Sequence, residues 1–132
     1  MQGNNSTKSI KQLQLEHEYE AWERSLEFFR QENTLLKYRL SEMVDNIEEN
    51  KFLQMAEYFQ NELLIKDEKL NELTKCLQEF SGKMNIVGNQ KEGPKEPICE
   101  LDTLRKNILK FEKKFLVLVK DFNEKLLSDI NV

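Results

Sequence analysis

The stretch from residue 15 to residue 47 reads LEHEYEAWERSLEFFRQENTLLKYRLSEMVDNI, and it decides the fold class. Apolar or aromatic side chains recur in it at alternating spacings of four and three residues, with one polar interruption. The positions of this seam are Leu15, Tyr19, Trp22, Leu26, Phe29, Asn33, Leu36, Leu40, Met43 and Ile47. A strand, whose side chains repeat every second residue, cannot produce this spacing. The pattern predicts a helix over residues 9–47.

A second seam follows, but its phase differs from that of the first. Continuing the first count beyond Ile47 reaches only polar residues, whereas a new count works from Ala56 onward. Its positions are Ala56, Phe59, Leu63, Lys66, Leu70, Leu73, Leu77 and Phe80. The phase slips at residues 46–51, where Asn46 and Glu49 have the spacing of an N-terminal capping box. We expect a tight reversal there and a second helix over 51–81, in an antiparallel hairpin; one continuous helix with a heptad discontinuity is the alternative.

Glycine and proline divide the remaining chain. Three of the four glycines and both prolines lie between Gly82 and Pro97, so we expect a loop over 82–97. Pro97 suits a first helical turn and predicts a third helix over 98–130. Its seam positions are Leu101, Leu104, Ile108, Phe111, Phe115, Leu118 and Phe122. Residues 1–8 contain nothing to bury, and we expect them to be disordered.

Two helices carry more apolar surface than one seam needs. Ala21, Phe28 and Leu35 form a second stripe beside the seam of the first helix, and Leu109 and Leu116 widen that of the third. A wide apolar face indicates contact with more than one neighbour. We therefore predict an all-α fold: a long antiparallel helical hairpin plus a third helix, as a three-helix bundle or coiled-coil-like assembly that a second chain can complete.

Asn33 and Lys66 are the polar interruptions of their seams. If the hairpin folds about residues 49 and 50, both fall in one layer. Buried polar groups cost about 1–3 kcal/mol when unpaired. We expect the two side chains to meet each other or a nearby acid, namely Glu32, Glu62, Asp67 or Glu112. Alternatively, Asn33 fixes the register and Lys66 extends its charged end to an open edge.

The composition excludes several classes of function. The net charge is −4, which argues against a chain that binds nucleic acid by neutralising phosphates. No Gly-rich phosphate loop is present, and no apolar run approaches the roughly 20 residues of a membrane span. We expect a cytoplasmic protein that contacts neither nucleic acid nor membrane. Cys76 and Cys99 are expected to be reduced thiols.

Catalytic and metal chemistry find little support. His17 is the only histidine, so neither a zinc helix with two histidines nor a di-iron bundle can be built. His17 has Glu16, Glu20 and Glu23 nearby, which leaves a weak metal site as an alternative to an exposed imidazole. Cys99 would lie in the first turn of the third helix, where the helix dipole lowers a thiol pKa. We expect no enzyme, no cofactor and no bound metal.

Residues around Trp22, Asn33, Arg39 and Leu40, together with the Tyr58–Asn61 segment, resemble a group of short bacterial helical proteins of unassigned role. The resemblance covers residues 15–80. It implies a helical bundle and no activity.

The function expected from these observations is that of a non-catalytic interaction module. It would bind a helical protein partner, most simply a second copy of itself, through its apolar seam. The expected partner-binding residues are Trp22, Phe29, Leu36, Leu40, Phe111, Phe115 and Phe122. The alternative is a helical bundle that binds a metal or a small ligand, through the polar layer of Asn33 and Lys66 or the acidic surround of His17.

Overall fold

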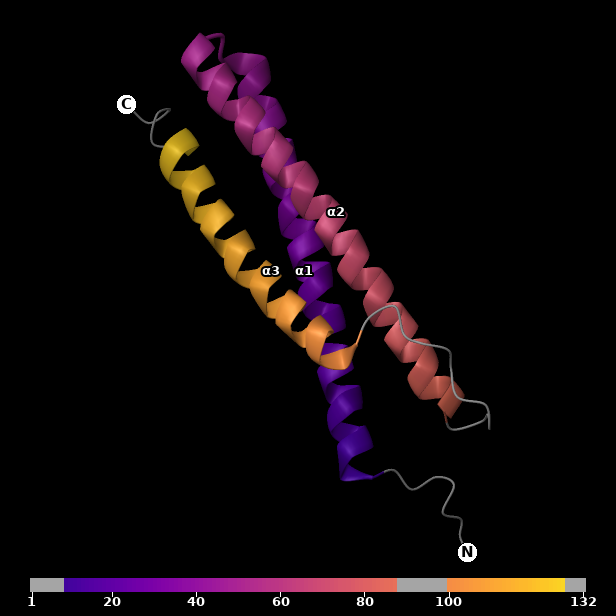
Figure 1. Cartoon of the computed structure of the whole chain (residues 1–132). Helices are drawn as coiled ribbons and strands as arrows, with labels where there is room; N and C mark the ends of the chain where they lie inside the picture. The colour runs from indigo at the N-terminus through magenta and orange to yellow at the C-terminus, as the bar shows by residue number, and fades with distance from the viewer. Residues whose placement is uncertain (1–8, 88–99, 128–132) are drawn as a thin grey trace, which may run out of the picture.

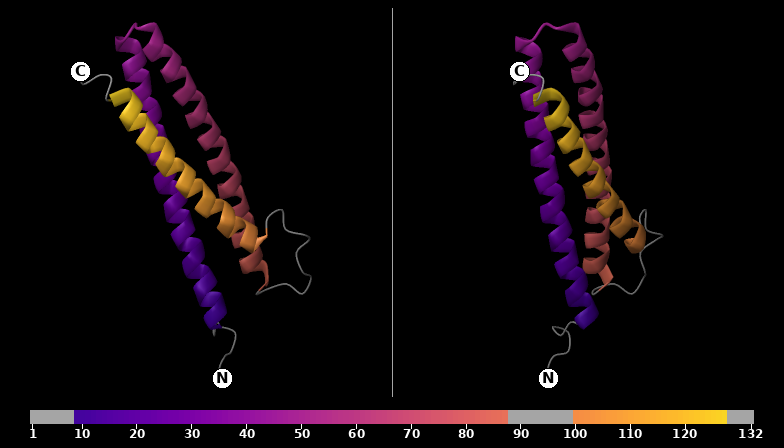
Figure 2. Two further views of the ribbon diagram at one scale, coloured as in Figure 1. Left: turned by 60° about the vertical axis from the view of Figure 1, so that its left-hand side comes forward. Right: turned by 90° about the vertical axis from the view of Figure 1, so that its left-hand side faces the viewer.

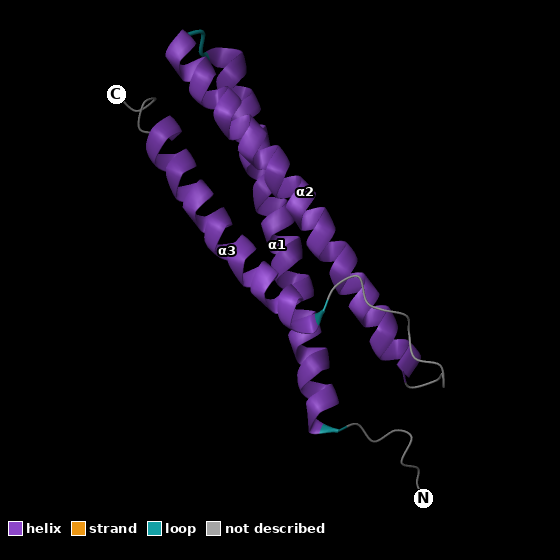
Figure 3. Cartoon of the chain, in the orientation of Figure 1, coloured by secondary structure: helices purple, strands orange, loops and turns teal. Residues whose placement is uncertain are grey.

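A computed structural model describes residues 9–87 and 100–127 of the chain, with side chains for 9–82 and 100–126. Within these ranges it contains helices and no strand (Figure 3). They are α1 (Ile10–Asn46), α2 (Asn50–Val87) and α3 (Leu101–Phe122), the last continued by a π-helical turn, η2 (Asn123–Leu127). The predicted all-α fold with three helices is confirmed.

Helices α1 and α2 form an antiparallel hairpin (Figure 1). Residues 47–49 connect them, so the reversal lies where the two seams change phase, and the alternative of one continuous helix is wrong. The expected capping box is wrong in detail. Asn46 is the last residue of α1, and its Nδ2 donates to the carbonyl oxygen of Glu42 at 2.7 Å. The Asn46 side chain therefore bonds back to a carbonyl in the last turns of α1, and Asn46 does not begin α2.

A capping box does exist at the start of α1. The Ser9 hydroxyl accepts a hydrogen bond from the Gln12 amide at 3.1 Å, and the Gln12 side chain accepts one from the Ser9 amide at 3.1 Å. Two amides that the helix itself cannot pair are thereby satisfied. This local chemistry begins α1 at Ile10, although that part of the helix is exposed.

Helix α2 is longer than expected. It continues to Val87, six residues beyond the predicted end at 81, and passes through Gly82. The predicted start of the loop at 82 is therefore wrong, because one glycine costs a helix only about 1 kcal/mol. Residues 88–97 of the expected loop and the expected disordered residues 1–8 lie outside the described residues.

Helix α3 is shorter than expected at its start. Glu100 is its N-cap residue, and the amide of Leu104 donates to the Glu100 carbonyl at 2.8 Å. The helix thus begins at Leu101, three residues after the predicted start at 98. At the other end the α-helix gives way to η2, which brings Leu126 into the core. Residues 128–130 of the predicted helix lie outside the described residues.

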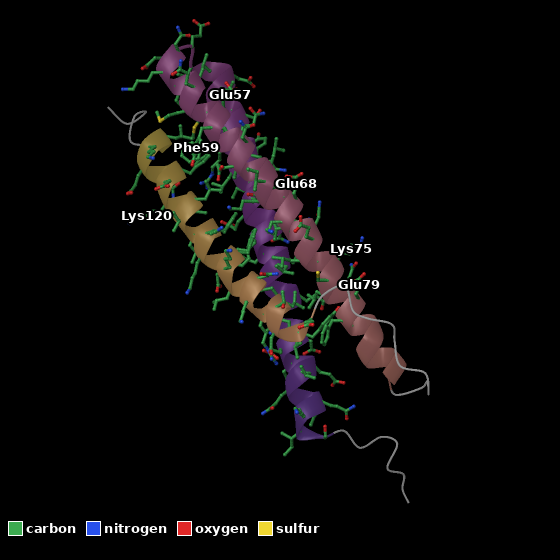
Figure 4. The ribbon with its side chains drawn as sticks, viewed as in Figure 1. Glu57, Phe59, Glu68, Lys75, Glu79 and Lys120 are labelled. Carbon is green, nitrogen blue, oxygen red and sulfur yellow. The ribbon has the colours of Figure 1, made fainter. Side chains whose placement is uncertain are left out.

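Helix α3 lies along the open side of the hairpin and contacts both of its helices (Figures 1 and 2). Aromatic rings fill the centre: Phe29 of α1 contacts Phe111 and Phe115 of α3 at centroid distances of 5.6 and 5.3 Å. Nearer the hairpin turn, Phe59 of α2 contacts Phe122 at 5.5 Å. Figure 4 shows Phe59 on the side of α2 that faces α3.

The predicted seams form this core. The buried hydrophobic residues are Leu26, Phe29, Leu36, Leu40, Phe52, Ala56, Phe59, Leu63, Leu70, Leu73, Leu77, Leu104, Ile108, Phe111, Phe115, Leu118, Phe122 and Leu126. Two of them, Phe52 and Leu126, extend the predicted seams at one end. Heptad spacing therefore predicted which face of each helix turns inward.

Candidate functional site

The polar layer that the sequence predicts in the hairpin centres on Asn33. Its side chain is fully buried, and Nδ2 donates to the carbonyl oxygen of Leu63 at 3.0 Å and to Oδ1 of Asp67 at 2.8 Å. Asp67 was one of the expected partners. The other carboxylate oxygen of Asp67 accepts a hydrogen bond from Nζ of Lys37, at the edge of the hairpin. The layer therefore runs from the core to the surface between α1 and α2.

This arrangement aligns the two helices. A shift of α2 by one residue would take both acceptors away from the Asn33 amide and leave a buried donor unpaired. Oδ1 of Asn33 has no partner among the described residues, so the layer already leaves one buried oxygen unsatisfied. Asn33 thus acts as a register residue, a role that is well attested for a lone polar residue in a helical seam.

Lys66 lies apart from this network. Its side chain is 8% exposed, and within the described part of the chain it forms no hydrogen bond or ion pair, with Asn33 or any other residue. Burial lowers its pKa; Glu62 opposes this effect, whereas Lys114 and Lys69 add to it. Lys66 lines two hollows between α2 and α3. The expectation that Asn33 and Lys66 meet each other is wrong, because Lys66 faces the α3 side of α2.

The residues expected to bind a partner are mostly interior. Phe29, Leu36, Leu40, Phe111, Phe115 and Phe122 are each at most 4% exposed, and Trp22 packs against the core while partly buried. The chain covers these side chains with its own helices. A surface that a partner can reach without unfolding the bundle must therefore consist of other residues.

Exposed apolar side chains on α1 and α3 offer such a surface. Phe28 and Leu35 of α1 and Leu109 and Leu116 of α3 are 43–57% exposed. Arg105 contacts α1, and Leu109 lies one turn after it, with Leu116 two turns further on the same side. On α1, Phe28 lies one turn before Glu32, and Leu35 lies one turn after it. Glu32 itself lies two heptads after Glu18, the residue that pairs with Arg105. We call these four residues the apolar row.

Complementary charges flank the apolar row. Outside it on α1 lie the exposed acids Glu20 and Glu27, and outside it on α3 lie the exposed lysines Lys106, Lys113 and Lys120. Near the N-terminal ends of both helices, Arg105 donates two hydrogen bonds to the Glu18 carboxylate, at 2.7 and 2.8 Å. These bonds raise the pKa of Arg105. The bidentate pair links α3 to α1 at this end of the bundle.

The remaining sequence candidates receive less support. His17 is exposed, 3.9 Å from the Glu20 carboxylate, and the described residues contain no group of three or more His, Cys, Asp or Glu side chains that could hold a metal ion. Cys76 is disulfide-bonded, so the expectation of reduced thiols is wrong for it; Cys99 lies outside the described residues. None of the described helices combines the length and apolar character that crossing a membrane requires.

Comparison with protein-family models, with curated proteins and with solved structures finds no match to this chain.

Proposed function

We propose that this chain is a non-catalytic interaction module that pairs with a second copy of itself through the apolar row. The observation that carries the proposal is the exposure of Phe28 and Leu35 on α1 and of Leu109 and Leu116 on α3, two helices that the Glu18–Arg105 pair joins. Contiguous exposed apolar surface on a small protein is typical of an interaction site. Phe28 and Leu35 belong to the second apolar stripe that the sequence shows on the first helix, and Leu109 and Leu116 are the residues that widen the apolar face of the third helix.

Charge argues for a second copy as the partner. Helices α1 and α3 run parallel, so a two-fold axis along the bundle places α1 of one chain beside α3 of the other. Glu20 and Glu27 then face the lysines at 106 and 113 across each edge of the interface, and such pairs set orientation more than affinity. An axis across the bundle would place α3 beside α3 and set like charges against each other.

Sedimentation velocity over a hundredfold range of concentration tests this proposal. We expect a concentration-dependent dimer for the unaltered chain and a monomer for the double variant Phe28→Glu with Leu116→Glu. Leu64→Glu is the matched control, because Leu64 is 50% exposed on α2, away from the row, and we expect this variant to remain dimeric. A compact monomer at every concentration, or a dimer that survives the double variant, would contradict the proposal.

The cellular compartment is a separate question. The composition suggests the cytoplasm, but disulfides persist mainly in oxidising compartments, and the disulfide-bonded Cys76 favours such a compartment. Alkylation of free thiols in intact cells, followed by peptide mapping of Cys76, tests this. Modification of Cys76 before reduction would show that the disulfide is absent there and would restore the cytoplasmic proposal.

A further inference from the structure

A small hollow between α2 and α3 has four lysines in its wall. Its volume is about 160 Å³, and Lys66 and Lys69 of α2 and Lys110 and Lys114 of α3 line it, with Asn107 beside them. Ile65 and Phe111 supply its apolar part, and no acid in the described part of the chain lines it. We call it the lysine hollow. It lies on the opposite side of α3 from the apolar row.

The convergence of these amines follows from helix geometry. Lys66 and Lys69 lie three residues apart and Lys110 and Lys114 four, so each pair occupies one face of its helix. The packing of α3 on α2 then turns the two faces toward the same hollow. Each pair is visible in the sequence, but their meeting depends on how the helices pack.

Little negative charge compensates this cluster. Lys69 has a 3.4 Å contact with Glu72 at the exposed surface. Lys66, Lys110 and Lys114 form no ion pair within the described part of the chain. Two acids, Glu62 and Asp121, line an adjoining hollow of about 490 Å³ together with Lys113. Three positive charges thus share the lysine hollow without direct counter-ions.

Lys66 is the most constrained of these amines. Its side chain is mostly buried, and burial lowers its pKa, as do Lys114 and Lys69, while Glu62 raises it. A mostly buried lysine without an ion-pair partner is unfavourable, and the cost falls when an anion supplies charge and hydrogen-bond acceptors. The structure therefore contains a charge that an anionic ligand would satisfy.

We propose that the lysine hollow binds the phosphate group of a small ligand, through Lys66, Lys110 and Lys114. A phosphate group carries up to two negative charges and several acceptor oxygens on one small tetrahedron, so it can accept from several ammonium groups at once. A single carboxylate offers one charge and two oxygens. This proposal does not depend on self-association, because the apolar row and the lysine hollow share no residue.

Isothermal titration with inorganic pyrophosphate at pH 7 and fixed ionic strength tests the proposal on the full chain. We expect saturable binding of one ion per chain. Lys66→Met and Lys114→Met should each weaken it by about tenfold or more, the usual effect of losing one hydrogen bond between charged groups. Lys75→Met is the matched control, because Lys75 is an exposed lysine of α2 (Figure 4) that does not line the hollow. The affinity of this variant for pyrophosphate should change by less than about twofold. Helical circular dichroism verifies that each variant folds.

Three results would overturn the proposal. The first is no heat of binding beyond that of chloride at equal ionic strength, and the second is equal weakening by the Lys75 variant. The third is equally tight binding of a glutamate peptide with the charge of pyrophosphate, which would assign the cluster to an acidic protein.

Vesicles containing phosphatidic acid form a second arm of the experiment. Vesicle binding that Lys66→Met abolishes supports phosphate recognition and assigns the phosphate to a lipid headgroup, whereas vesicle binding that this variant leaves intact contradicts the proposal.

Discussion

At the scale of single residues, two buried polar side chains behave differently in the same region of the bundle. Asn33 is neutral and finds two acceptors, so it contributes alignment at low cost. Lys66 is charged and has no direct partner among the described residues, so its burial opposes folding. Spacing alone places both in helical seams, but the neighbouring helix decides which one is satisfied.

The contribution of Asn33 is measurable by truncation. We expect Asn33→Ala to lower the free energy of unfolding by about 1–3 kcal/mol, since the Leu63 carbonyl loses its side-chain donor and a cavity forms. Chemical denaturation measures this change. Thr34→Ala, at an exposed neighbouring position of α1, should change stability by less than about 0.5 kcal/mol. Equal effects of both substitutions would show that Asn33 does not set the register between α1 and α2.

Removal of the Lys66 charge should have the opposite effect. We expect Lys66→Met to raise the free energy of unfolding at pH 7 by about 1 kcal/mol, because an apolar side chain of similar length replaces a mostly buried lysine that has no ion-pair partner among the described residues.

The pH dependence of this difference follows from the direction of the pKa shift. The pKa of Lys66 is lower in the folded chain than its unfolded value of 10.5, so between the two values the unfolded chain binds more protons. Stability of the unaltered chain therefore rises with pH in this window, and its deficit against Lys66→Met should shrink as the pH approaches 10.5. Denaturation of both proteins between pH 7 and pH 10.5 measures the trend; a constant deficit would argue against a buried charge at Lys66.

At the scale of secondary-structure elements, the ends of the helices depend on local chemistry more than on hydrophobic spacing. Ser9 and Gln12 begin α1 in an exposed segment, and Asn46 closes the same helix. Gly82 fails to stop α2, because the helix satisfies its backbone groups on both sides of that residue. The π turn at the end of α3 contributes Leu126 to the core.

Gly82 provides a test at this scale. A Cβ atom added there meets nothing within 4 Å, so an alanine fits without strain. We expect Gly82→Ala to raise the free energy of unfolding by about 0.5–1 kcal/mol, because alanine has less freedom to lose on entering a helix. Denaturation measures the gain. A loss of stability would mean that residue 82 is not helical in solution.

At the scale of the whole molecule, the hairpin and α3 bury one side of each helix and leave two different surfaces beside α3. The apolar row lies toward α1 and the lysine hollow toward α2. The aromatic core stands between them, with Phe29, Phe111 and Phe115 in mutual contact. This arrangement allows self-pairing on one side and ligand binding on the other, without competition for the same residues.

Charge exchange tests the proposed orientation of the dimer. We expect Glu20→Lys with Glu27→Lys to weaken dimerisation, because each dimer edge then brings like charges together. Adding Lys106→Glu and Lys113→Glu to the same chain should restore it, since attraction returns across both edges. Sedimentation at low salt measures both steps, because screening suppresses the effect at high salt. Failure of the fourfold variant to recover would exclude the orientation with α1 beside α3.

The sequence by itself determined the helical class, the inward face of each helix and the position of the reversal. Each of these is encoded in residues close together in the chain: the alternation of four and three, and the phase slip after Ile47. It also marked Ala21, Phe28 and Leu35 as surplus apolar surface. It failed at Gly82, which the helix α2 passes through, and at Asn46, whose side chain donates to a carbonyl of α1 and does not cap α2.

Only the tertiary structure decided what each seam contacts. The aromatic residues expected to bind a partner became the core, because α3 packs onto the hairpin and covers them. Asn33 donates a hydrogen bond to Asp67, whereas Lys66 lines a hollow with three other lysines, and this hollow exists only where α2 and α3 pack together. The physical reason is that burial and charge depend on distances between residues far apart in the chain, and the periodicity of one helix carries no information about them.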